Sequence, residues 1–250
     1  MIAVTFALPA ESSDFTRLLQ DREPGARGAG AIVAGTLHNR AISVVETGVG
    51  QAAAGARLSA FLESTTPTLL ISAGFAGATD NQLRPGDVML AENFCAPDLG
   101  AAARRVLART NVRVGKLATA TAVIDSTSER ERFARNTGAL AIDMETESIA
   151  ERCAEFGIPM LSLRAITDTP AFPFPAPPHV LFDVGQQKTI ATRLALYLAT
   201  HPSSIGRLIA FAKRVSVARA SLTAMLDLLL RSESLAAAVS ASRASSRSPS

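Results

Sequence analysis

Short apolar runs alternate with stretches of helical spacing along most of this chain. The runs that predict strands lie at residues 2–8, 31–37, 41–46, 68–72, 87–94, 116–124, 140–142 and 159–166. The stretches that predict helices lie at residues 12–20, 51–63, 101–110, 128–136, 147–156 and 189–200. This order is typical of an α/β fold. We therefore expect one α/β domain over residues 1–200, a three-layer sandwich with a mixed, twisted central sheet.

A different pattern follows residue 200. Apolar residues recur there at near-helical spacing with basic residues between them, which predicts an amphipathic helical extension over residues 201–231. We expect its apolar face to dock on the main domain, on a second subunit or on a membrane surface. From Ser232 onward the chain is mostly Ser, Ala and Arg, which bury too little apolar surface to fold. Residues 232–250 are therefore predicted to be a disordered tail.

The composition fits a globular protein, because 48% of the 250 residues are apolar. Cys95 and Cys153 have no partner motif, and the three histidines lack metal-ligand spacing. We therefore expect reduced thiols in a cytoplasmic protein, with no metal and no cofactor. The first apolar run lacks a basic leader and is followed by Pro9 and Glu11, which favours a strand over a signal peptide. No apolar run has the length of a membrane span.

The net charge of +3 comes from the C-terminal part of the chain. Residues 203–250 contain seven basic and two acidic residues, a balance of +5, which leaves −2 for residues 1–202. The basic character is therefore weak support for nucleic-acid binding by the main domain. The basic charge of the helical extension would favour a weak contact with anionic lipid. The sequence therefore allows two locations, the cytoplasm alone or the cytoplasm with contact at the inner membrane face.

Acidic and glycine-rich segments follow several predicted strands. These segments are Glu11, residues 47–50, residues 73–77, the acidic run 143–147 and Asp168. The carboxyl ends of parallel strands meet at one edge of a sheet, where open α/β folds bind ligands. A carboxylate placed there can accept two hydrogen bonds from neighbouring hydroxyls, as the diol of a ribose offers. The alternative is that the acidic residues only favour a helix N-terminus and the glycines only form turns.

Residues 170–178 contain five prolines and two phenylalanines. Such a segment forms neither a regular helix nor a central strand. It is either an ordered wall over a ligand site or a plain connector, and the sequence leaves both interpretations open.

The strand-end segments resemble the motifs of one family, in the same order along the chain. Residues 7–11, Ala-Leu-Pro-Ala-Glu, resemble its first-strand motif, and residues 47–53 resemble Ser-Gly-Ile-Gly-Lys-Val-Ala. Residues 74–77, Gly-Phe-Ala-Gly, resemble Gly-Ser-Ala-Gly, and residues 86–88, Gly-Asp-Val, match Gly-Asp-Ile/Val. Residues 143–145, Asp-Met-Glu, resemble Glu-Met-Glu, and residues 164–168, Arg-Ala-Ile-Thr-Asp, resemble Arg-Ala-Ile-Ser-Asp. The chain is similar to the purine nucleoside phosphorylase and uridine phosphorylase superfamily. Within it, the chain resembles methylthioadenosine/S-adenosylhomocysteine nucleosidases and the hopanoid-associated nucleoside phosphorylase branch.

This resemblance implies roles for individual residues. Glu11 would orient or deprotonate the attacking water and Asp168 would protonate N7 of a purine, which makes these two the candidate catalytic residues. Glu145 would hold the ribose hydroxyls, and Met144 would pack on the base or the ribose. Further substrate contacts are implied for Phe75, Gly77 and Val123.

The chain departs from the family pattern at two places. Phe75 stands where the nucleosidases have a small hydroxyl residue. Residues 119–123, Thr-Ala-Thr-Ala-Val, replace a Gly-Asp-x-Phe-Ile segment, so the aromatic residue that stacks on the base is missing there. Phe172 and Phe174 are candidates to replace it.

The reaction implied is cleavage of the N-glycosidic bond of a purine nucleoside by water. The substrate would be a 5′-substituted adenosine, such as methylthioadenosine, S-adenosylhomocysteine or an adenosyl-lipid, and adenine would be released. The alternative is phosphorolysis, for which the family places Arg side chains near the strand ends. Residues 1–13 and 68–80 contain no Arg, which favours hydrolysis, although Arg40 or Arg57 could supply one.

A third possibility is a catalytically inactive relative that only binds a nucleoside. In each case the expected partners are a small-molecule purine nucleoside and further copies of the chain, in a homodimer or a higher homo-oligomer. No nucleic-acid partner is expected.

Overall fold

The computed structural model describes residues 1–25, 32–177, 180, 197, 200–201 and 204–245. The strands in this part of the chain are β1 (Ile2–Phe6), β2 (Gln20–Pro24), β3 (Ile32–Leu37), β4 (Arg40–Glu46), β5 (Leu69–Ala78), β6 (Val88–Ala91), β7 (Arg113–Gly115), β8 (Leu117–Thr119), β9 (Ala141–Asp143) and β10 (Met160–Asp168). The helices are α1 (Pro9–Leu18), α2 (Gln51–Ser64), α3 (Pro97–Leu107), α4 (Thr127–Thr137), α5 (Thr146–Glu155), α8 (Ser204–Arg231) and α9 (Glu233–Ser245).

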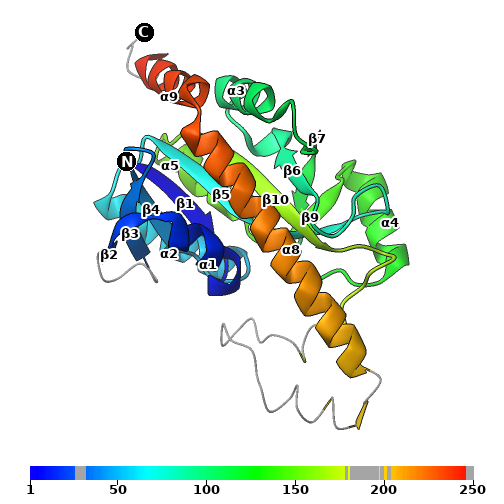
Figure 1. Cartoon of the computed structure of the whole chain (residues 1–250). Coiled ribbons are helices and arrows are strands. Elements are labelled where there is room, and N and C mark those ends of the chain that lie inside the picture. The colour runs from blue at the N-terminus through cyan, green and yellow to red at the C-terminus, as the bar shows by residue number, and fades with distance from the viewer. Residues whose placement is uncertain (26–31, 178–179, 181–196, 198–199, 202–203, 246–250) are drawn as a thin grey trace.

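All ten strands belong to one mixed sheet, in the order β2-β3-β4-β1-β5-β10-β6-β7, with β8 and β9 attached beside β5. Strands β4, β1, β5 and β10 are parallel neighbours, whereas β2, β3, β6 and β9 make antiparallel pairs. Figure 1 shows the twist of this sheet and the helices on its two faces. The α/β sandwich expected from the sequence is confirmed.

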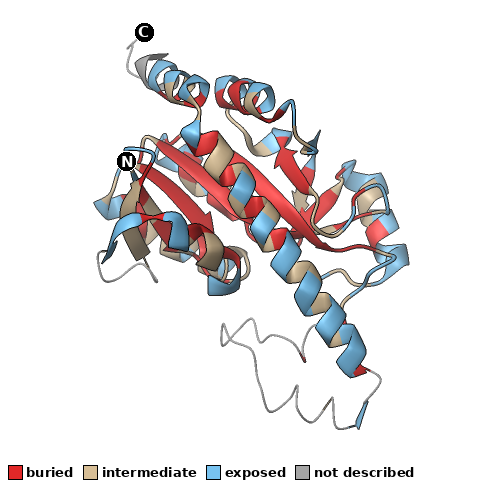
Figure 2. Cartoon of the chain, in the orientation of Figure 1, coloured by how far each residue is buried: buried red, intermediate tan, exposed pale blue. Residues whose placement is uncertain are grey.

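The central strands are buried on both faces, as parallel strands between helices must be. Successive side chains of β1 point to opposite faces of the sheet. Val4 packs in the core on the face that α1 covers, and Ala3 packs in the core on the face that α2 covers. On one face, Leu58 of α2 and Ile149 of α5 cover the sheet. On the other face, the cover comes from α1, α3, α8 and α9, which share one apolar core (Figure 2). This arrangement brings the carboxyl ends of β1, β4, β5 and β10 to one edge.

Two strands are longer than the sequence predicts. The glycine-rich residues 73–77, expected to form a loop, continue β5 to Ala78, and β10 reaches Asp168. Neighbouring side chains leave little room for a larger residue at these glycines: a Cβ at Gly74 would lie 3.3 Å from the Glu11 carboxylate. Conversely, regular strand structure within residues 116–124 is limited to β8. The hairpin predicted around residues 39–40 is confirmed, with His38 and Asn39 at positive φ in the tight turn.

The C-terminal residues are more ordered than their composition suggests. The predicted amphipathic extension is a single helix, α8, that crosses the sheet face diagonally (Figure 1). The prediction of a disordered tail is wrong for residues 233–245, which form α9 with Leu235 and Val239 buried in the main core. Helix α3 supplies the apolar surface that these side chains need. The helix predicted at residues 189–200 falls mostly outside the described residues.

Two polar contacts hold the end of α8 against the β3–β4 hairpin. The imidazole Nε2 of His38 lies 2.7 Å from Oδ1 of Asp227, and Arg40 Nη2 donates to the Ser232 carbonyl at 2.9 Å. Hence α8 is part of the main domain over its second half. Within the described ranges, no helix has both the length and the apolar character that crossing a bilayer demands.

The buried half of α8 should contribute to global stability. Leu222 is fully buried in the shared core, whereas Ile209, on the outer half of the same helix, is 54% exposed. We expect Leu222→Ala to lower the free energy of unfolding by about 2–5 kcal/mol because it leaves a cavity. Ile209→Ala should change it by less than about 0.5 kcal/mol. Urea unfolding measures both, and equal small effects would show that α8 is not part of the cooperative core.

Candidate active site

A pocket lies at the carboxyl ends of the central strands. Its walls come from β1, α1, the β4–α2 connection, β5, the start of α5 and β10. The lining residues are Thr5, Phe6, Ala7, Glu11, Thr47, Ala73, Gly74, Phe75, Glu145, Ile149 and Arg164. Three of the segments singled out in the sequence, with Glu11, Phe75 and Glu145, therefore meet in one place.

Glu11 is placed in the pocket by the abrupt start of α1 at Pro9. Its carboxylate accepts hydrogen bonds from three backbone N–H groups: Ala7 at 2.8 Å, Leu8 at 3.2 Å and Phe75 at 3.1 Å. Burial raises the pKa of Glu11 above its ordinary value, although these bonds and the charge of Arg164 act in the opposite direction. The carboxylate is thus fixed in place and made more basic, as a base that acts on water requires.

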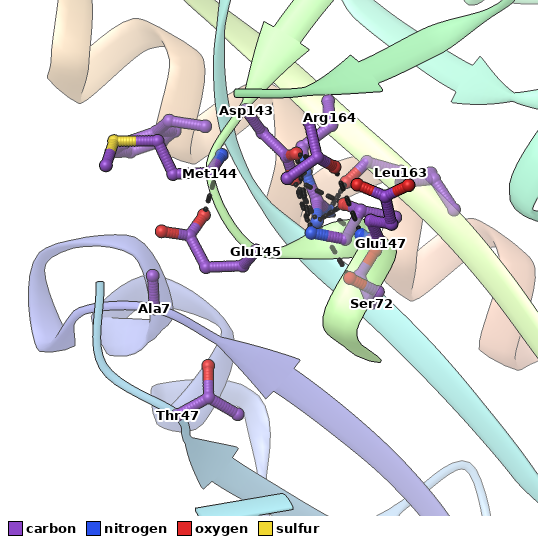
Figure 3. Close-up of polar contacts among 12 residues, drawn as sticks. Ala7, Thr47, Ser72, Asp143, Met144, Glu145, Glu147, Leu163 and Arg164 are labelled. Atoms are coloured by element: carbon purple, nitrogen blue, oxygen red, sulfur yellow. Dashed lines mark hydrogen bonds and ion pairs between the residues drawn. The ribbon is translucent and has the colours of Figure 1, made fainter. Parts of the chain in front are cut away.

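Glu145 faces the same pocket from the residue that precedes α5. Its Oε1 accepts a hydrogen bond from Gly50 N at 2.7 Å, and its Oε2 accepts one from Met144 N at 3.3 Å. Burial, and next the negative charge of Asp143, raise the pKa of Glu145 to about 8. Figure 3 shows its side chain directed away from the contact between Asp143 and Arg164.

Arg164 and Asp143 form a buried ion pair beside this carboxylate (Figure 3). Arg164 Nε donates to Asp143 Oδ2 at 3.0 Å, and Nη1 donates to the carbonyls of Ser72 and Leu163 at 2.8 and 2.7 Å. Nη2 donates to Ser72 Oγ at 2.8 Å and also contacts Thr146 Oγ1. The guanidinium is therefore fully engaged, and its charge is balanced by Asp143.

Asp168, the second predicted catalytic residue, ends β10 and is 1% exposed. Its Oδ1 accepts a hydrogen bond from Thr167 Oγ1 at 2.7 Å, and its Oδ2 pairs with Arg130 of α4. It lies next to Gly77 of β5, whereas Glu11 lies next to Gly74. The described residues that line the Glu11 pocket do not include Asp168, and the two carboxylates lie beside β5 residues that are three positions apart.

The other predicted contact residues lie around these two groups. Phe75 lines the Glu11 pocket, and Gly77 pairs with Ile142 of β9. Met144 is half-buried and precedes Glu145, while Val123 is 39% exposed in the segment between β8 and α4. In the described part of the chain, no group of three or more His, Cys, Asp or Glu side chains could hold a metal ion.

Sequence reasoning missed two buried arginines that organise these carboxylates. Arg164 stood within a recognised motif, where it could have been noticed as a charge inside an otherwise apolar strand. Arg130 gave no such signal, because it lies in the run Ser-Glu-Arg-Glu-Arg, which reads as a solvated helix face. Only the packing of α4 against β5 and β10 shows that this one arginine points inward.

Comparison with known proteins agrees with this geometry. The family model for the phosphorylase superfamily matches residues 1–105 and 92–200. The 5′-methylthioadenosine/S-adenosylhomocysteine nucleosidase of Staphylococcus epidermidis is 24% identical over 196 residues, which cover 67% of this chain and 86% of that protein.

Two solved structures share the fold. The nucleosidase of the same name from Neisseria meningitidis, in complex with methylthio-immucillin-A, superposes with a TM-score of 0.70 at 15% identity, over 92% of this chain and 98% of that one. Futalosine hydrolase of Helicobacter pylori gives 0.67 at 19% identity, over 90% and 97% of the two chains.

The raised pKa of Glu145 predicts a pH-dependent stability. Because the fold raises this pKa, the stability that protonated Glu145 contributes to the folded state is fully present below about pH 4.5. It is lost as the pH rises through about 8. We expect Glu145→Gln, which cannot ionise, to gain stability over the wild type by on the order of 2 kcal/mol between pH 5 and 9. Urea unfolding across this range measures the difference. Glu147→Gln, at the exposed neighbour, is the matched control, and a Glu145→Gln curve parallel to that of the wild type would contradict the assignment.

Proposed function

We propose that this chain, which belongs to the phosphorylase superfamily, is a purine nucleosidase that cleaves the N-glycosidic bond of a 5′-substituted adenosine with water and releases adenine. One observation carries the proposal. Two buried carboxylates, Glu11 and Glu145, face a single pocket, and Arg164, the cation among the described residues that line it, is already neutralised by Asp143. Such a pocket stabilises positive charge and has a base for water, which are the two needs of glycoside hydrolysis.

Glu145 is suited to the ribose. Backbone N–H groups of Gly50 and Met144 fix its two oxygens, and each oxygen keeps a lone pair for a ribose hydroxyl. As the bond between C1′ and the base breaks, positive charge grows on the sugar. An ionised Glu145 then attracts the transition state more strongly than the substrate, and this difference lowers the barrier.

Glu11 is suited to the water. Its three backbone hydrogen bonds hold the carboxylate rigidly, and burial makes it a better proton acceptor. A water bound to this carboxylate would be oriented towards C1′ and would lose its proton as the new C–O bond forms. Asp168, at the end of β10 beside Gly77, would donate a proton to N7 so that the base leaves uncharged.

The charges of the pocket favour water over phosphate as the nucleophile. A phosphate site needs unengaged cationic or N–H donors, and two carboxylates repel a phosphate anion. Of the candidates named from the sequence, Arg40 donates to the Ser232 carbonyl, and it starts β4 whereas the pocket lies at the other end of that strand. Arg57 lies in the second turn of α2 and does not line the pocket. Phosphorolysis is therefore the alternative outcome of the test below.

The choice of substrate rests on the relatives. The nucleosidases of Staphylococcus epidermidis and Neisseria meningitidis carry methylthioadenosine and S-adenosylhomocysteine in their names, and the latter structure holds methylthio-immucillin-A. We therefore propose an adenosine with an apolar or extended 5′ substituent, which includes these two compounds and an adenosyl-lipid. Residues 170–177 follow Asp168 and would border the substituent.

Release of adenine tests the reaction and its nucleophile together. With methylthioadenosine, S-adenosylhomocysteine or adenosine as substrate, we expect the wild type to release adenine at a rate that phosphate does not change. Glu11→Gln should lower kcat by at least about 100-fold, since general base catalysis is worth that much or more. Glu46→Gln is the control, because Glu46 ends β4 outside the pocket lining. Formation of ribose 1-phosphate derivatives in phosphate buffer would instead identify a phosphorylase.

We further propose that the outer half of α8 is a contact surface, in a homo-oligomer or at an anionic membrane face. Ile205, Ile209 and Val217 are 46%, 54% and 55% exposed on this half, and Arg207 and Lys213 are exposed beside them. An amphipathic helix with basic flanks binds anionic lipid weakly. The protein would then be cytoplasmic, with reversible contact at the inner membrane face.

A surface substitution separates these contacts better than truncation, because removal of α8 would also remove its buried core half. We expect Ile209→Glu to reduce co-sedimentation with phosphatidylserine-containing vesicles at low salt by several-fold. Leu18→Glu, at an apolar position of α1 that is 40% exposed, should not reduce it. Vesicle binding that is absent in the wild type, together with a dimer in sedimentation that Ile209→Glu dissociates, would assign the surface to self-association instead.

A further inference from the structure

The helix α4 is largely polar and exposed, but one of its charged residues is buried. Its N-terminus is capped by Ser126, whose Oγ accepts a hydrogen bond from Glu129 N at 3.3 Å, and it ends at Gly138 with φ of 68°. Arg130 is the buried residue of this helix, with 2% exposure. A buried arginine on a solvated helix requires an explanation in terms of what it contacts.

The guanidinium of Arg130 joins the ends of two central strands. Its Nη1 donates to the carbonyl of Ala78 on β5 at 2.8 Å, and its Nη2 donates to Oδ2 of Asp168 on β10. The space is closely filled: a Cβ at Gly77 would lie 2.7 Å from Asp168 Oδ2 and 3.0 Å from Arg130 Nη1. The pair is therefore built into the strand ends, and glycine at position 77 makes room for it.

Two cations and a hydroxyl group surround the Asp168 carboxyl group. A guanidinium taken out of water needs a counter-charge, and Asp168 is the carboxylate that Arg130 contacts. A second cation, Arg214 of α8, lies within electrostatic reach of Asp168 and is itself held by the Pro173 carbonyl at 3.2 Å. Thr167 donates its hydroxyl proton to Oδ1. Of the other charged residues of the adjoining elements, Arg164 is paired with Asp143, and Asp87 accepts from Arg84 N.

The contact with Arg130 bears on how Asp168 would act as an acid. For the base to leave uncharged, the O–H proton of Asp168 must pass to N7 while the C1′–N9 bonding pair moves to the base. Water then bonds to C1′, and its proton passes through Glu11 to solvent. Asp168 afterwards regains a proton from solvent, and the arginine keeps the carboxyl group in one orientation from turnover to turnover.

We propose that Arg130 is a positioning residue that orients the Asp168 carboxyl group for cleavage of purine nucleosides. This inference rests on the proposed nucleosidase reaction. Arg130 holds Oδ2, so that Oδ1, beside Thr167, is the oxygen that carries the proton to the base.

Turnover of two substrates tests the proposal. With methylthioadenosine, Arg130→Gln should lower kcat by about 100-fold, since a reacting group misplaced by about 1 Å costs that much. With a nitrophenyl riboside, whose leaving group needs no proton, kcat should stay near that of the wild type. Arg130→Lys keeps the charge and should lie between the wild type and Arg130→Gln. Arg132→Gln, on the exposed face of the same helix, is the matched control.

A kcat with methylthioadenosine that Arg130→Gln leaves unchanged, or a kcat that falls equally with both substrates, would overturn the proposal. A stability cycle gives a readout that needs no activity. Arg130→Gln and Asp168→Asn each leave one partner buried alone, so the double variant should unfold at a higher urea concentration than either single variant. Additive losses would show that the two groups are not coupled. If the wild type released no adenine at all, the nucleosidase proposal would fail, while this cycle would still decide whether Arg130 controls Asp168.

Discussion

The buried ion pair between Arg164 and Asp143 is the contact on which the pocket depends. Arg164 belongs to β10, Asp143 ends β9, and the same guanidinium reaches Ser72 of β5. One side chain thus joins three strands at the edge where the ligand site lies. The pair fixes Thr146 and the start of α5 through hydrogen bonds. Because the two charges cancel, the pair adds no free cation to the pocket. The electrostatic character of the pocket is then left to Glu11 and Glu145.

A buried arginine pairs with a carboxylate at two places on this edge of the sheet, and the two pairs have different effects. Arg164 balances a carboxylate that shapes the site, and its partner Asp143 takes no part in the proposed chemistry. Arg130 balances Asp168, which does take part. A buried arginine can therefore either support the structure of the site or position a reacting group. Which role it has depends on whether its carboxylate partner faces the substrate. Neither arginine contacts the substrate in the proposed reaction.

The sequence was sufficient for the sheet and for much of the pocket, because both depend on local patterns. Apolar runs placed nearly every strand, and the acidic and glycine-rich strand ends brought Glu11, Phe75 and Glu145 together. It was insufficient where tertiary contacts override composition. Residues 73–77 form strand because they pair with β10 and β9, and carboxylates fill the space beside Gly74 and Gly77. Helix α9 is ordered because α3 covers Leu235 and Val239, and nothing in its Ser- and Ala-rich sequence indicates that cover.

The position of α8 has a consequence for how the protein is made. Leu222, Leu226 and Leu229 complete a core whose other members lie in β1, β5 and β10, so the last sixth of the chain covers strands that begin at residue 2. During synthesis, an apolar face of the sheet must therefore stay uncovered until almost the whole polypeptide has left the ribosome. A chain released early would present that face to its neighbours, and its fate would be aggregation or degradation rather than a smaller working enzyme.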